Sequence, residues 1–457
     1  MFVDRKREIK ILEERLRTKR SEFIILYGRR RVGKTELLRR LIRDYPHIYY
    51  MADQRNAIGQ LEIISWLLCE HFHDEYISSN PLRNWDQFFS YLRTKDFGDQ
   101  KLLLIIDEFP YLVVSSPELP SIIQRHWDEW LNQRNILIIL CGSSMSFMEK
   151  EIMSYKSPLY GRRTGQIELL PFDYKNVARM LQMNICEKLI QFIGVFGTVP
   201  AYIEMANSKK SVWWNIEEQI FPGDRFLHNE IMFLLMQELR SPKNYFAILR
   251  SIALGNTKIN DIVKSTQLER GVVGKYLDNL IELRIVERRI PATENPLKSR
   301  KGIYIINDNY FRFWFRYIYP YLTYIEEGRK YTVMEKIKSD FPTYLGYIFE
   351  EVCREFLKLN SHHIPFEYDR MGSWWDKNEE IDILAYNNKG DKLLGECKFS
   401  NKKVGTDILD NLKRKENLLN IIHKTTHYIL FSKSGFTDAL EQKASSENVI
   451  LIELKEM

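Results

Sequence analysis

The clearest chemistry in this sequence belongs to a glycine-rich loop near its start. Residues 28–35 read GRRRVGKT, which matches the phosphate-loop pattern G-x-x-x-x-G-K-[ST]. Backbone N–H groups of such a loop surround a phosphate, its lysine reaches the β- and γ-phosphates, and its hydroxyl holds Mg²⁺. The loop therefore predicts a nucleotide site in which Lys34 is catalytic and Thr35 is a metal ligand. The residues predicted to surround the phosphates are Gly28, Arg29, Arg30, Arg31, Val32, Gly33, Lys34, Thr35 and Glu36.

Two carboxylates follow an apolar run in the same part of the chain. Residues 102–106 read LLLII and lead into Asp107 and Glu108. A carboxylate at the carboxyl end of a buried strand faces the phosphate loop. Asp107 would then hold the Mg²⁺ shell as a metal ligand, and Glu108 would orient and deprotonate the attacking water. The alternative is that the two acidic residues simply end a buried strand.

Polar residues after the next strand add to the predicted catalytic set. Residues 136–141 run into Gly142 and Ser143, and the serine hydroxyl would bond the attacking water or the γ-phosphate. A serine-rich turn is the alternative. Arg162 and Arg163 precede a further strand and would stabilise phosphoryl charge within the chain or across a subunit boundary. The alternative is that Arg162 and Arg163 are ordinary surface residues. The same two alternatives hold for Arg29, Arg30 and Arg31, because a phosphate loop binds through its backbone N–H groups and their side chains can point away.

Alternating strands and helices must position these residues. The strand-like runs of the first part are residues 23–27, 48–52, 102–107, 136–141 and 166–170. Helical stretches separate these runs, which predicts an α/β fold with a parallel sheet of the P-loop NTPase type over residues 1–170. Beyond Pro171 the apolar spacing becomes helical, and a helical lid is expected over residues 171–240.

The next segment, residues 241–325, has the pattern of a winged helix. Two short amphipathic helices flank a turn at 266–269, and strands are expected at 285–290 and 303–306. Basic residues there would contact DNA phosphates, which gives affinity without sequence information; they are Arg270, Lys275, Arg288, Arg289, Lys298, Arg300 and Lys301. A protein-interaction role is the alternative. The aromatic stretch 310–324 is interpreted as a packed helix that joins two domains.

A second set of carboxylates lies in the last part, residues 326–457. Asp382 lies in EEIDIL, and Glu396 with Lys398 lies in LLGECKFS, where strand geometry places the latter two on one face. Carboxylate oxygens for Mg²⁺ and an ammonium near the attacking water are what phosphodiester hydrolysis requires. Glu350 in a preceding helix would be the fourth member, with Glu351 as the alternative.

Length, charge and cysteines narrow the class of protein. A chain of 457 residues is longer than the length at which a single hydrophobic core usually stops growing, so several domains are expected. The net charge of +6 only weakly favours an anionic partner, and no apolar run is long enough for a membrane span. Five widely spaced cysteines indicate neither a disulfide framework nor a zinc site. With a charged N-terminus that is no secretion signal, we expect a cytoplasmic protein.

Several motifs together resemble one known family. The motifs are FVDR at residues 2–5 with Glu8, GRRRVGKT, LLLIIDEF, CGSS, PLYGRR and the GTVP of residues 197–200. They look like the archaeal-type P-loop ATPase family of the AAA+ and STAND branch, and the likeness covers essentially the whole chain. It implies ATP as the nucleotide, Arg5 near the adenine, and Pro200 at the lid. Thr198 departs from the family pattern, which usually has a second glycine there.

The same family often carries a winged helix and a restriction-endonuclease-like C-terminal domain. The set Glu350, Asp382, Glu396 and Lys398 likewise resembles the PD-(D/E)xK nuclease superfamily. Members of such families cleave nucleic acid or keep the fold for binding only.

Three functions follow as hypotheses. The leading one is a Mg²⁺-dependent ATPase that couples ATP binding and hydrolysis to DNA binding or processing through the winged helix and the nuclease-like domain. The alternatives are an ATP-regulated, structure-specific DNA endonuclease, and an ATP-gated signalling or scaffold switch whose inactive nuclease-like domain binds a protein. ATP and DNA are the expected partners, a membrane is not, and a homo-oligomer and an unidentified protein partner stay open.

Overall fold

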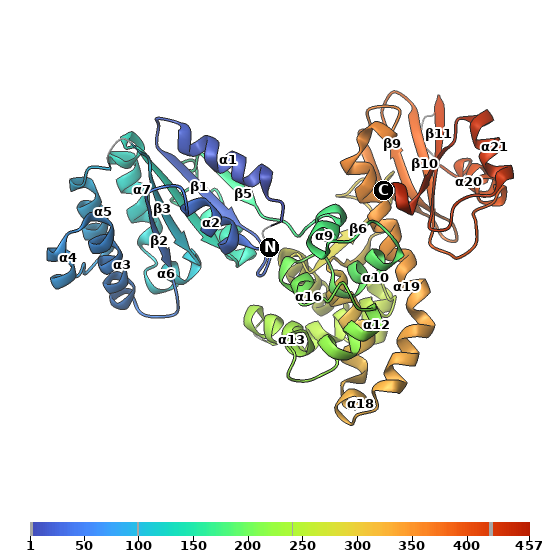
Figure 1. The fold of residues 1–457 in the computed structure, drawn as a ribbon, viewed down its shortest axis with the longest axis horizontal. Coiled ribbons are helices and arrows are strands. Elements are labelled where there is room, and N and C mark those ends of the chain that lie inside the picture. The colour runs from blue at the N-terminus through green and yellow to red at the C-terminus, as the bar shows by residue number, and fades with distance from the viewer. Residues whose placement is uncertain (1–2, 98–99, 240, 420–423) are drawn as a thin grey trace. The chain divides into compact units, whose positions relative to one another are not determined.

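The computed structural model describes residues 3–97, 100–239, 241–419 and 424–457. Phe2 of the FVDR motif and Arg240, the last residue of the predicted lid, lie outside these ranges. The chain divides into two compact units, Met1–Pro171 and Phe172–Met457, here called the first and the second unit. Each unit contains a five-stranded sheet with helices against it (Figure 1). In the described part of the chain, no helix combines the length and the apolar character that crossing a membrane demands.

The first unit is built on a parallel sheet with the strand order β2-β3-β4-β1-β5. Its strands are β1 (Glu22–Tyr27), β2 (His47–Met51), β3 (Leu102–Asp107), β4 (Ile136–Gly142) and β5 (Gly165–Glu168). Strands β1, β3 and β4 are buried along their whole length, as expected for parallel strands covered on both faces. The predicted α/β fold class is confirmed.

Helices cover both faces of this sheet. The helices of the first unit are α1 (Lys6–Arg17), α2 (Lys34–Ile42), α3 (Ala57–Phe72), α4 (Glu75–Ser79), α5 (Trp85–Thr94), α6 (Phe109–Ser115), α7 (Leu119–Glu129) and α8 (Met145–Phe147). Ile24 and Leu26 point to a core with α1 and α2, whereas Phe23 and Ile25 point to a core with α3, α5, α6 and α7. Because successive side chains of β1 point to opposite faces of the sheet, this one strand contributes to two separate cores.

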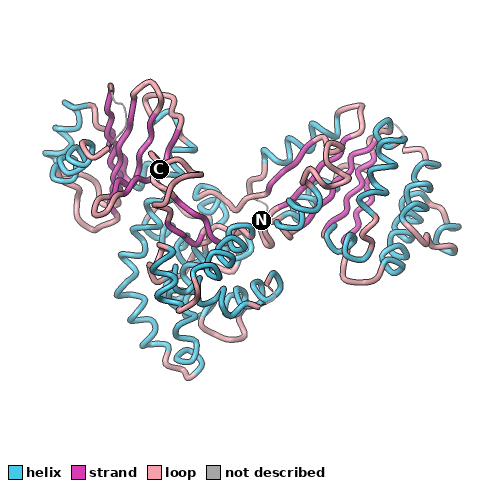
Figure 2. Tube along the Cα trace, turned by 180° about the vertical axis from the view of Figure 1, so that it is seen from behind, coloured by secondary structure: helices cyan, strands magenta, loops and turns pink. Residues whose placement is uncertain are grey.

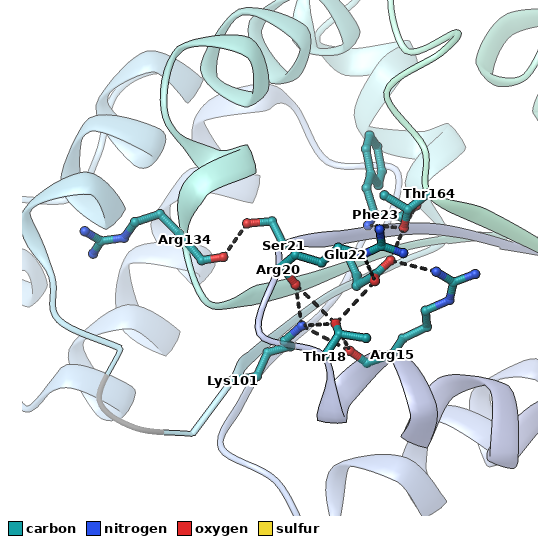
Figure 3. A network of polar contacts seen from close by, with 9 residues as sticks. All are labelled: Arg15, Thr18, Arg20, Ser21, Glu22, Phe23, Lys101, Arg134 and Thr164. Atoms are coloured by element: carbon teal, nitrogen blue, oxygen red, sulfur yellow. Dashed lines mark hydrogen bonds and ion pairs between the residues drawn. The ribbon is translucent and has the colours of Figure 1, made fainter.

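A buried polar network holds the amino end of β1 (Figure 3). Glu22 is fully buried and accepts hydrogen bonds from Arg15, Arg20, Thr18 and Thr164. Beside it, the Nζ atom of Lys101 donates to the carbonyl oxygens of Arg15 and Arg20, at 3.0 and 2.6 Å, and to the Thr18 hydroxyl at 2.9 Å. The network ties α1, β1 and the segments before β3 and β5 together.

The second unit begins with helices. They are α9 (Tyr174–Leu181), α10 (Glu187–Phe196), α11 (Pro200–Glu204), α12 (Val212–Asn215), α13 (Phe226–Glu238), α14 (Pro242–Ala253), α15 (Ile259–Thr266) and α16 (Arg270–Glu282). A two-stranded antiparallel ribbon follows, made of β6 (Val286–Arg289) and β7 (Ile303–Ile306). The aromatic stretch forms α17 (Asn309–Phe313), a π-helical turn (Trp314–Ile318) and α18 (Leu322–Glu326). Most of its rings up to Tyr317 are buried, so it packs as expected.

A long helix leads into the mixed sheet of the second unit (Figure 2). Helix α19 (Lys330–Leu359) precedes β8 (Arg370–Trp375), β9 (Glu380–Tyr386) and β10 (Asp391–Lys398), which pair antiparallel. Helix α20 (Thr406–Glu416) then leads to β11 (Thr425–Ser432), and α21 (Asp438–Glu447) leads to β12 (Ile450–Glu453). Both of these strands pair parallel, which gives the order β12-β11-β10-β9-β8. Trp374 is buried in the core of this sheet.

Candidate functional sites

The glycine loop of the first unit joins the end of β1 to the start of α2. Gly28 has a φ of 157°, and a Cβ there would lie 2.4 Å from the carbonyl oxygen of Leu169. Gly33 has a φ of 94° and stands at the N-cap of α2. Only glycine fits both demands without strain. The loop backbone and the first turn of α2 therefore form an anion site of the kind that holds a phosphate.

Lys34 lies folded back into this loop. Its Nζ donates to the carbonyl oxygens of Gly28 at 2.7 Å and Arg29 at 3.0 Å. Burial lowers the pKa of Lys34, although the charges of Glu108 and Asp107 act against that shift. Its ammonium thus lies inside the loop that a phosphate would enter.

Asp107 ends β3 beside the loop and accepts several hydrogen bonds. The Thr35 hydroxyl donates to its Oδ2 atom at 2.9 Å, and the Tyr49 hydroxyl donates to the same oxygen at 2.9 Å. The backbone N–H of Glu108 donates to Oδ1, also at 2.9 Å. The two predicted metal ligands, Thr35 and Asp107, are in direct contact. A hydroxyl and a carboxylate oxygen are a donor set that suits Mg²⁺.

Glu108 and Ser143 meet at the ends of neighbouring strands. The Ser143 hydroxyl donates to Oε2 of Glu108 at 2.9 Å. Glu108 has a left-handed backbone with a φ of 52°, at the N-cap of α6. This conformation is uncommon outside glycine and aims the carboxylate after the strand has ended. Thr35, Tyr49, Asp107, Glu108 and Ser143 thus form one hydrogen-bonded cluster, and the charge of Lys34 interacts with Glu108 and Asp107.

Arg5 lies close to the loop as well. Its Nη2 donates to the carbonyl oxygens of Val32 at 2.9 Å and of Leu170 at 2.8 Å. It therefore links the segment before α1, the phosphate loop and the end of the first unit. Its predicted position near the adenine stays a prediction.

Arg162 and Arg163 lie elsewhere on the sheet. Thr164 pairs with Phe23 at the start of β1, whereas the phosphate loop follows the end of that strand. Arg162 forms an ion pair with Asp128 on α7 at 3.0 Å, and Arg163 donates to the carbonyl oxygen of Met153. Both arginines therefore lie near the amino ends of the strands, whereas the phosphate loop lies at their carboxyl ends. This position does not suit a role on the γ-phosphate within the chain. Their action across a subunit boundary stays a prediction.

In the second unit, three carboxylates from α19 and β9 come together. Oxygens of Glu350 on α19 and of Glu380 and Asp382 on β9 all lie within 4.8 Å of one another. Asp382 is buried, and its Oδ2 accepts a hydrogen bond from the backbone N–H of Cys397 at 2.8 Å. Burial and then the Asp382 charge raise the pKa of Glu350. Carboxylates that repel one another in this way are a donor set for a divalent cation.

Glu396 and Lys398 lie next to this cluster on β10. The Lys398 Nζ is 2.7 Å from Oε1 of Glu396, and the buried Nζ of Lys415 on α20 is 3.2 Å from Oε2. Burial and then the Glu396 charge raise the pKa of Asp382. The structure therefore brings together all four residues of the predicted nuclease-like set. Glu380 and Lys415 also belong to this cluster, although neither was predicted from the sequence.

Glu351, the alternative to Glu350, points into a different environment. It accepts hydrogen bonds from Arg289 of β6 at 2.9 Å and from Arg312 of α17 at 3.0 Å. Burial alone would raise the pKa of Glu351, but the charges of Arg312 and Arg289 outweigh it and lower this pKa to about 2. Glu350 is thus the carboxylate that joins the cluster.

Comparisons with known proteins agree with the nucleotide site. Residues 2–194 match the family "ATPase domain predominantly from Archaea", and residues 314–416 match a family described as archaeal and bacterial proteins of unknown function. Protein MJECL04 of Methanocaldococcus jannaschii is 36% identical over 443 residues, which cover 95% of this chain and 96% of that protein. The chain belongs to the family of archaeal-type P-loop ATPases.

Solved structures similar to this ATPase include two archaeal proteins. The Walker-type ATPase PABY2304 of Pyrococcus abyssi is 21% identical, covering 69% of this chain and 96% of that one, with a TM-score of 0.48. The ORC2 protein of Aeropyrum pernix is 14% identical, covering 73% and 93%, with a TM-score of 0.44.

The β6–β7 ribbon, the predicted wing, differs in part from its predicted role. Arg289 is paired with Glu351 and with Glu287, so it is engaged inside the second unit instead of being offered to DNA phosphates. The loop between β6 and β7 bonds to β8, where the Ala292 N–H donates to the carbonyl oxygen of Ser373 at 2.9 Å. Exposed basic residues remain, and they are Arg270, Lys275, Arg288, Lys298, Arg300 and Lys301.

Proposed function

We propose that this ATPase hydrolyses ATP with Mg²⁺ and uses its nucleotide state to control metal-dependent cleavage of DNA by the second unit. In the nucleotide site, Lys34 would meet the β- and γ-phosphates, and Thr35 with Asp107 would hold Mg²⁺. Glu108 would take a proton from the attacking water, with Ser143 orienting its carboxylate. The contacts among these side chains support this division of roles.

One observation carries the proposal for the second unit: Glu350, Glu380 and Asp382 lie within 4.8 Å of one another. They come from a helix and a strand, and Glu396 and Lys398 extend the cluster on the next strand. A cation held by the carboxylates would polarise a phosphodiester, and Lys398 would lie near the attacking water. The antiparallel β8-β9-β10 meander followed by parallel β11 also fits the nuclease-like fold that the sequence resembles.

Cleavage of DNA by the full chain tests this assignment. We expect the protein to cut branched or duplex DNA in Mn²⁺ or Mg²⁺, and Asp382→Asn to abolish cutting while ATP hydrolysis continues. Asp376→Asn is the matched control, because this aspartate side chain is 56% exposed and lies outside the carboxylate cluster. If the unmodified protein cuts no DNA geometry, or if Asp382→Asn cuts as well, the nuclease assignment is wrong.

The helices α15 and α16 with the β6–β7 ribbon support a winged helix that contacts DNA. We assign it to residues 241–325, after a helical lid at 171–240 and before the nuclease-like domain at 326–457. Phosphate contacts of this kind make affinity fall steeply with salt. A cytoplasmic location fits the five free thiols.

A second candidate is an ATP-gated switch that binds a protein partner. It is favoured by the wing, whose loop is bonded to β8 and whose Arg289 is already paired. Measuring the ATPase rate with and without DNA at two salt concentrations separates the two candidates. The first requires stimulation by DNA that weakens as salt rises, whereas the switch requires no response to DNA and an ATP-dependent change of oligomeric state.

A further inference from the structure

A cavity of about 400 Å³ lies inside the second unit, next to the carboxylate cluster. Its walls come from the end of α14, the strands β6 and β7, helix α19 and single residues of β8 and β9. Glu350 and Glu380 of the cluster are among its lining residues. Pockets that hold one small ligand are about 300–1,000 Å³, so this volume suits a single small unit and not a duplex.

Part of the cavity wall is apolar. Ile252 and Ala253 of α14 and Ile303 and Ile305 of β7 line it, together with Tyr347 of α19. Tyr347 is 56% exposed, so its ring is open to a ligand at the rim of the cavity. An exposed aromatic ring beside aliphatic side chains is a surface on which a flat base stacks.

The remaining wall carries guanidinium groups. Four arginines line the cavity beside Glu350, Glu351 and Glu380, namely Arg289, Arg312, Arg316 and Arg354. Arg289 and Arg312 are paired with Glu351, and Arg316 is paired with Asp340. Arg354 donates one hydrogen bond among the described residues, from Nη1 to the carbonyl oxygen of Asp382 at 2.9 Å, and lies 3.9 Å from Glu350. A guanidinium has five N–H donors, so one hydrogen bond and one long ion pair do not use the whole donor set of Arg354, whose side chain is 15% exposed. The cavity thus combines a wall that suits a stacked base with N–H donors that suit a phosphate.

We infer that this cavity binds one nucleotide unit, with its base against Tyr347 and its phosphate at Arg354. The inference rests on the proposed function where that nucleotide belongs to a DNA strand, because Glu350 and Glu380 then face the neighbouring phosphodiester. A strand end or an unpaired nucleotide would enter the cavity, whereas a paired one would be too large. A free mononucleotide has the same chemistry, and the experiment separates these two sources.

Competition binding with the full chain tests the inference in EDTA, where no cleavage interferes. The probes are a fluorescein-labelled oligonucleotide of twelve thymidines and unlabelled thymidine 5′-monophosphate. Tyr347→Ala should weaken binding of both probes about fivefold or more, since loss of one aromatic stacking partner has effects of this size. Tyr347→Phe keeps the ring and should bind normally. The matched control is Tyr331→Ala, which removes a 77% exposed tyrosine of the same helix outside the cavity.

The outcomes distinguish the inference from the proposed function. Competition between the two probes, lost in Tyr347→Ala and in the cavity-filling Ser373→Phe, supports a strand nucleotide in the cavity. Binding of the mononucleotide alone supports the cavity as a free-nucleotide site and overturns the strand nucleotide as its occupant, while the proposed function keeps its own cleavage test. Oligonucleotide binding that is equal in all variants and insensitive to the mononucleotide overturns the cavity inference while DNA binding stands. If neither probe binds, the cavity inference fails, and the cleavage of branched or duplex DNA in Mn²⁺ decides the proposed function separately.

Discussion

The adjacent residues Glu350 and Glu351 on α19 offer a test in which one matched substitution has opposite effects. Glu351→Gln removes the charge that Arg289 and Arg312 meet at 2.9 and 3.0 Å. Loss of one partner of a buried ion pair costs about 3–5 kcal/mol, because the other charges stay buried without compensation. The pKa of Glu351 falls from 4.5 to about 2, which corresponds to about 3 kcal/mol by linkage.

Glu350→Gln should not destabilise the second unit. Its carboxylate lies within 4.8 Å of oxygens of Glu380 and Asp382, and the repulsion that the amide relieves outweighs the loss of the 3.9 Å ion pair with Arg354. Stability without metal should stay equal or rise. If Glu350 is a metal ligand, Mn²⁺ should raise the melting temperature of the unmodified protein and have little effect on Glu350→Gln.

Differential scanning calorimetry of the full chain measures both effects. The transition of the first unit is recognised by its shift with ATP, and the other transition reports the second unit. We expect Glu351→Gln to lower that second transition by about 6–12 °C. An unchanged transition in Glu351→Gln, or an equal loss in Glu350→Gln, would refute the division of roles between these residues.

Three further predictions concern the first unit. Tyr49→Phe should raise the Mg²⁺ concentration needed for half-maximal ATPase rate about tenfold, because outer partners of metal ligands have effects of this size, and the control Tyr50→Phe should not. Ser143→Ala should reduce ATP turnover about tenfold or more with ATP binding retained, since its bond to the Glu108 carboxylate is lost; unchanged turnover would remove Ser143 from the site. Glu22→Gln should lower the stability of the first unit by about 3 kcal/mol in urea unfolding. Burial opposes the effect, but bonds from Thr164 and Arg20 keep the pKa of Glu22 below 4.5. The contribution of Glu22 to stability is therefore complete above pH 4.5 and is lost as the pH falls through the lower pKa of the folded state. If the stability of Glu22→Gln falls with acid in parallel with that of the unmodified protein, this reasoning is wrong.

The strands of the first unit follow from the sequence because local signals mark them. Apolar runs between helical stretches predict β1, β3 and β4 to within one residue at each end. The phosphate loop is equally local, since its glycines and lysine are consecutive. Tyr49 was missed because its bond to Asp107 depends on the pairing of β2 with β3, which no local pattern encodes.

The second unit was harder to read. Helix α19, which carries Glu350, starts at Lys330 and continues through Pro342, although proline disfavours helix for the residue before it. The edge strands β8 and β12 were not predicted, because short half-buried strands carry a weak apolar pattern. Glu380 could have been predicted as a cluster member, because it lies two residues before Asp382 and therefore on the same face of the strand. Lys415 reaches Glu396 from a separate helix and had no such signal.

The most direct test of the central claim is the rate of DNA cleavage by the full chain in Mn²⁺ with ATP, with ADP and without nucleotide. We expect the cleavage rate to depend on the nucleotide. In Glu108→Gln, which should bind ATP without turnover, the cleavage rate with ATP should stay constant over time. Lys34→Ala should give the same rate in all three conditions. A cleavage rate that is identical with every nucleotide in the unmodified protein, or no cleavage at all, would contradict the coupling of the two units.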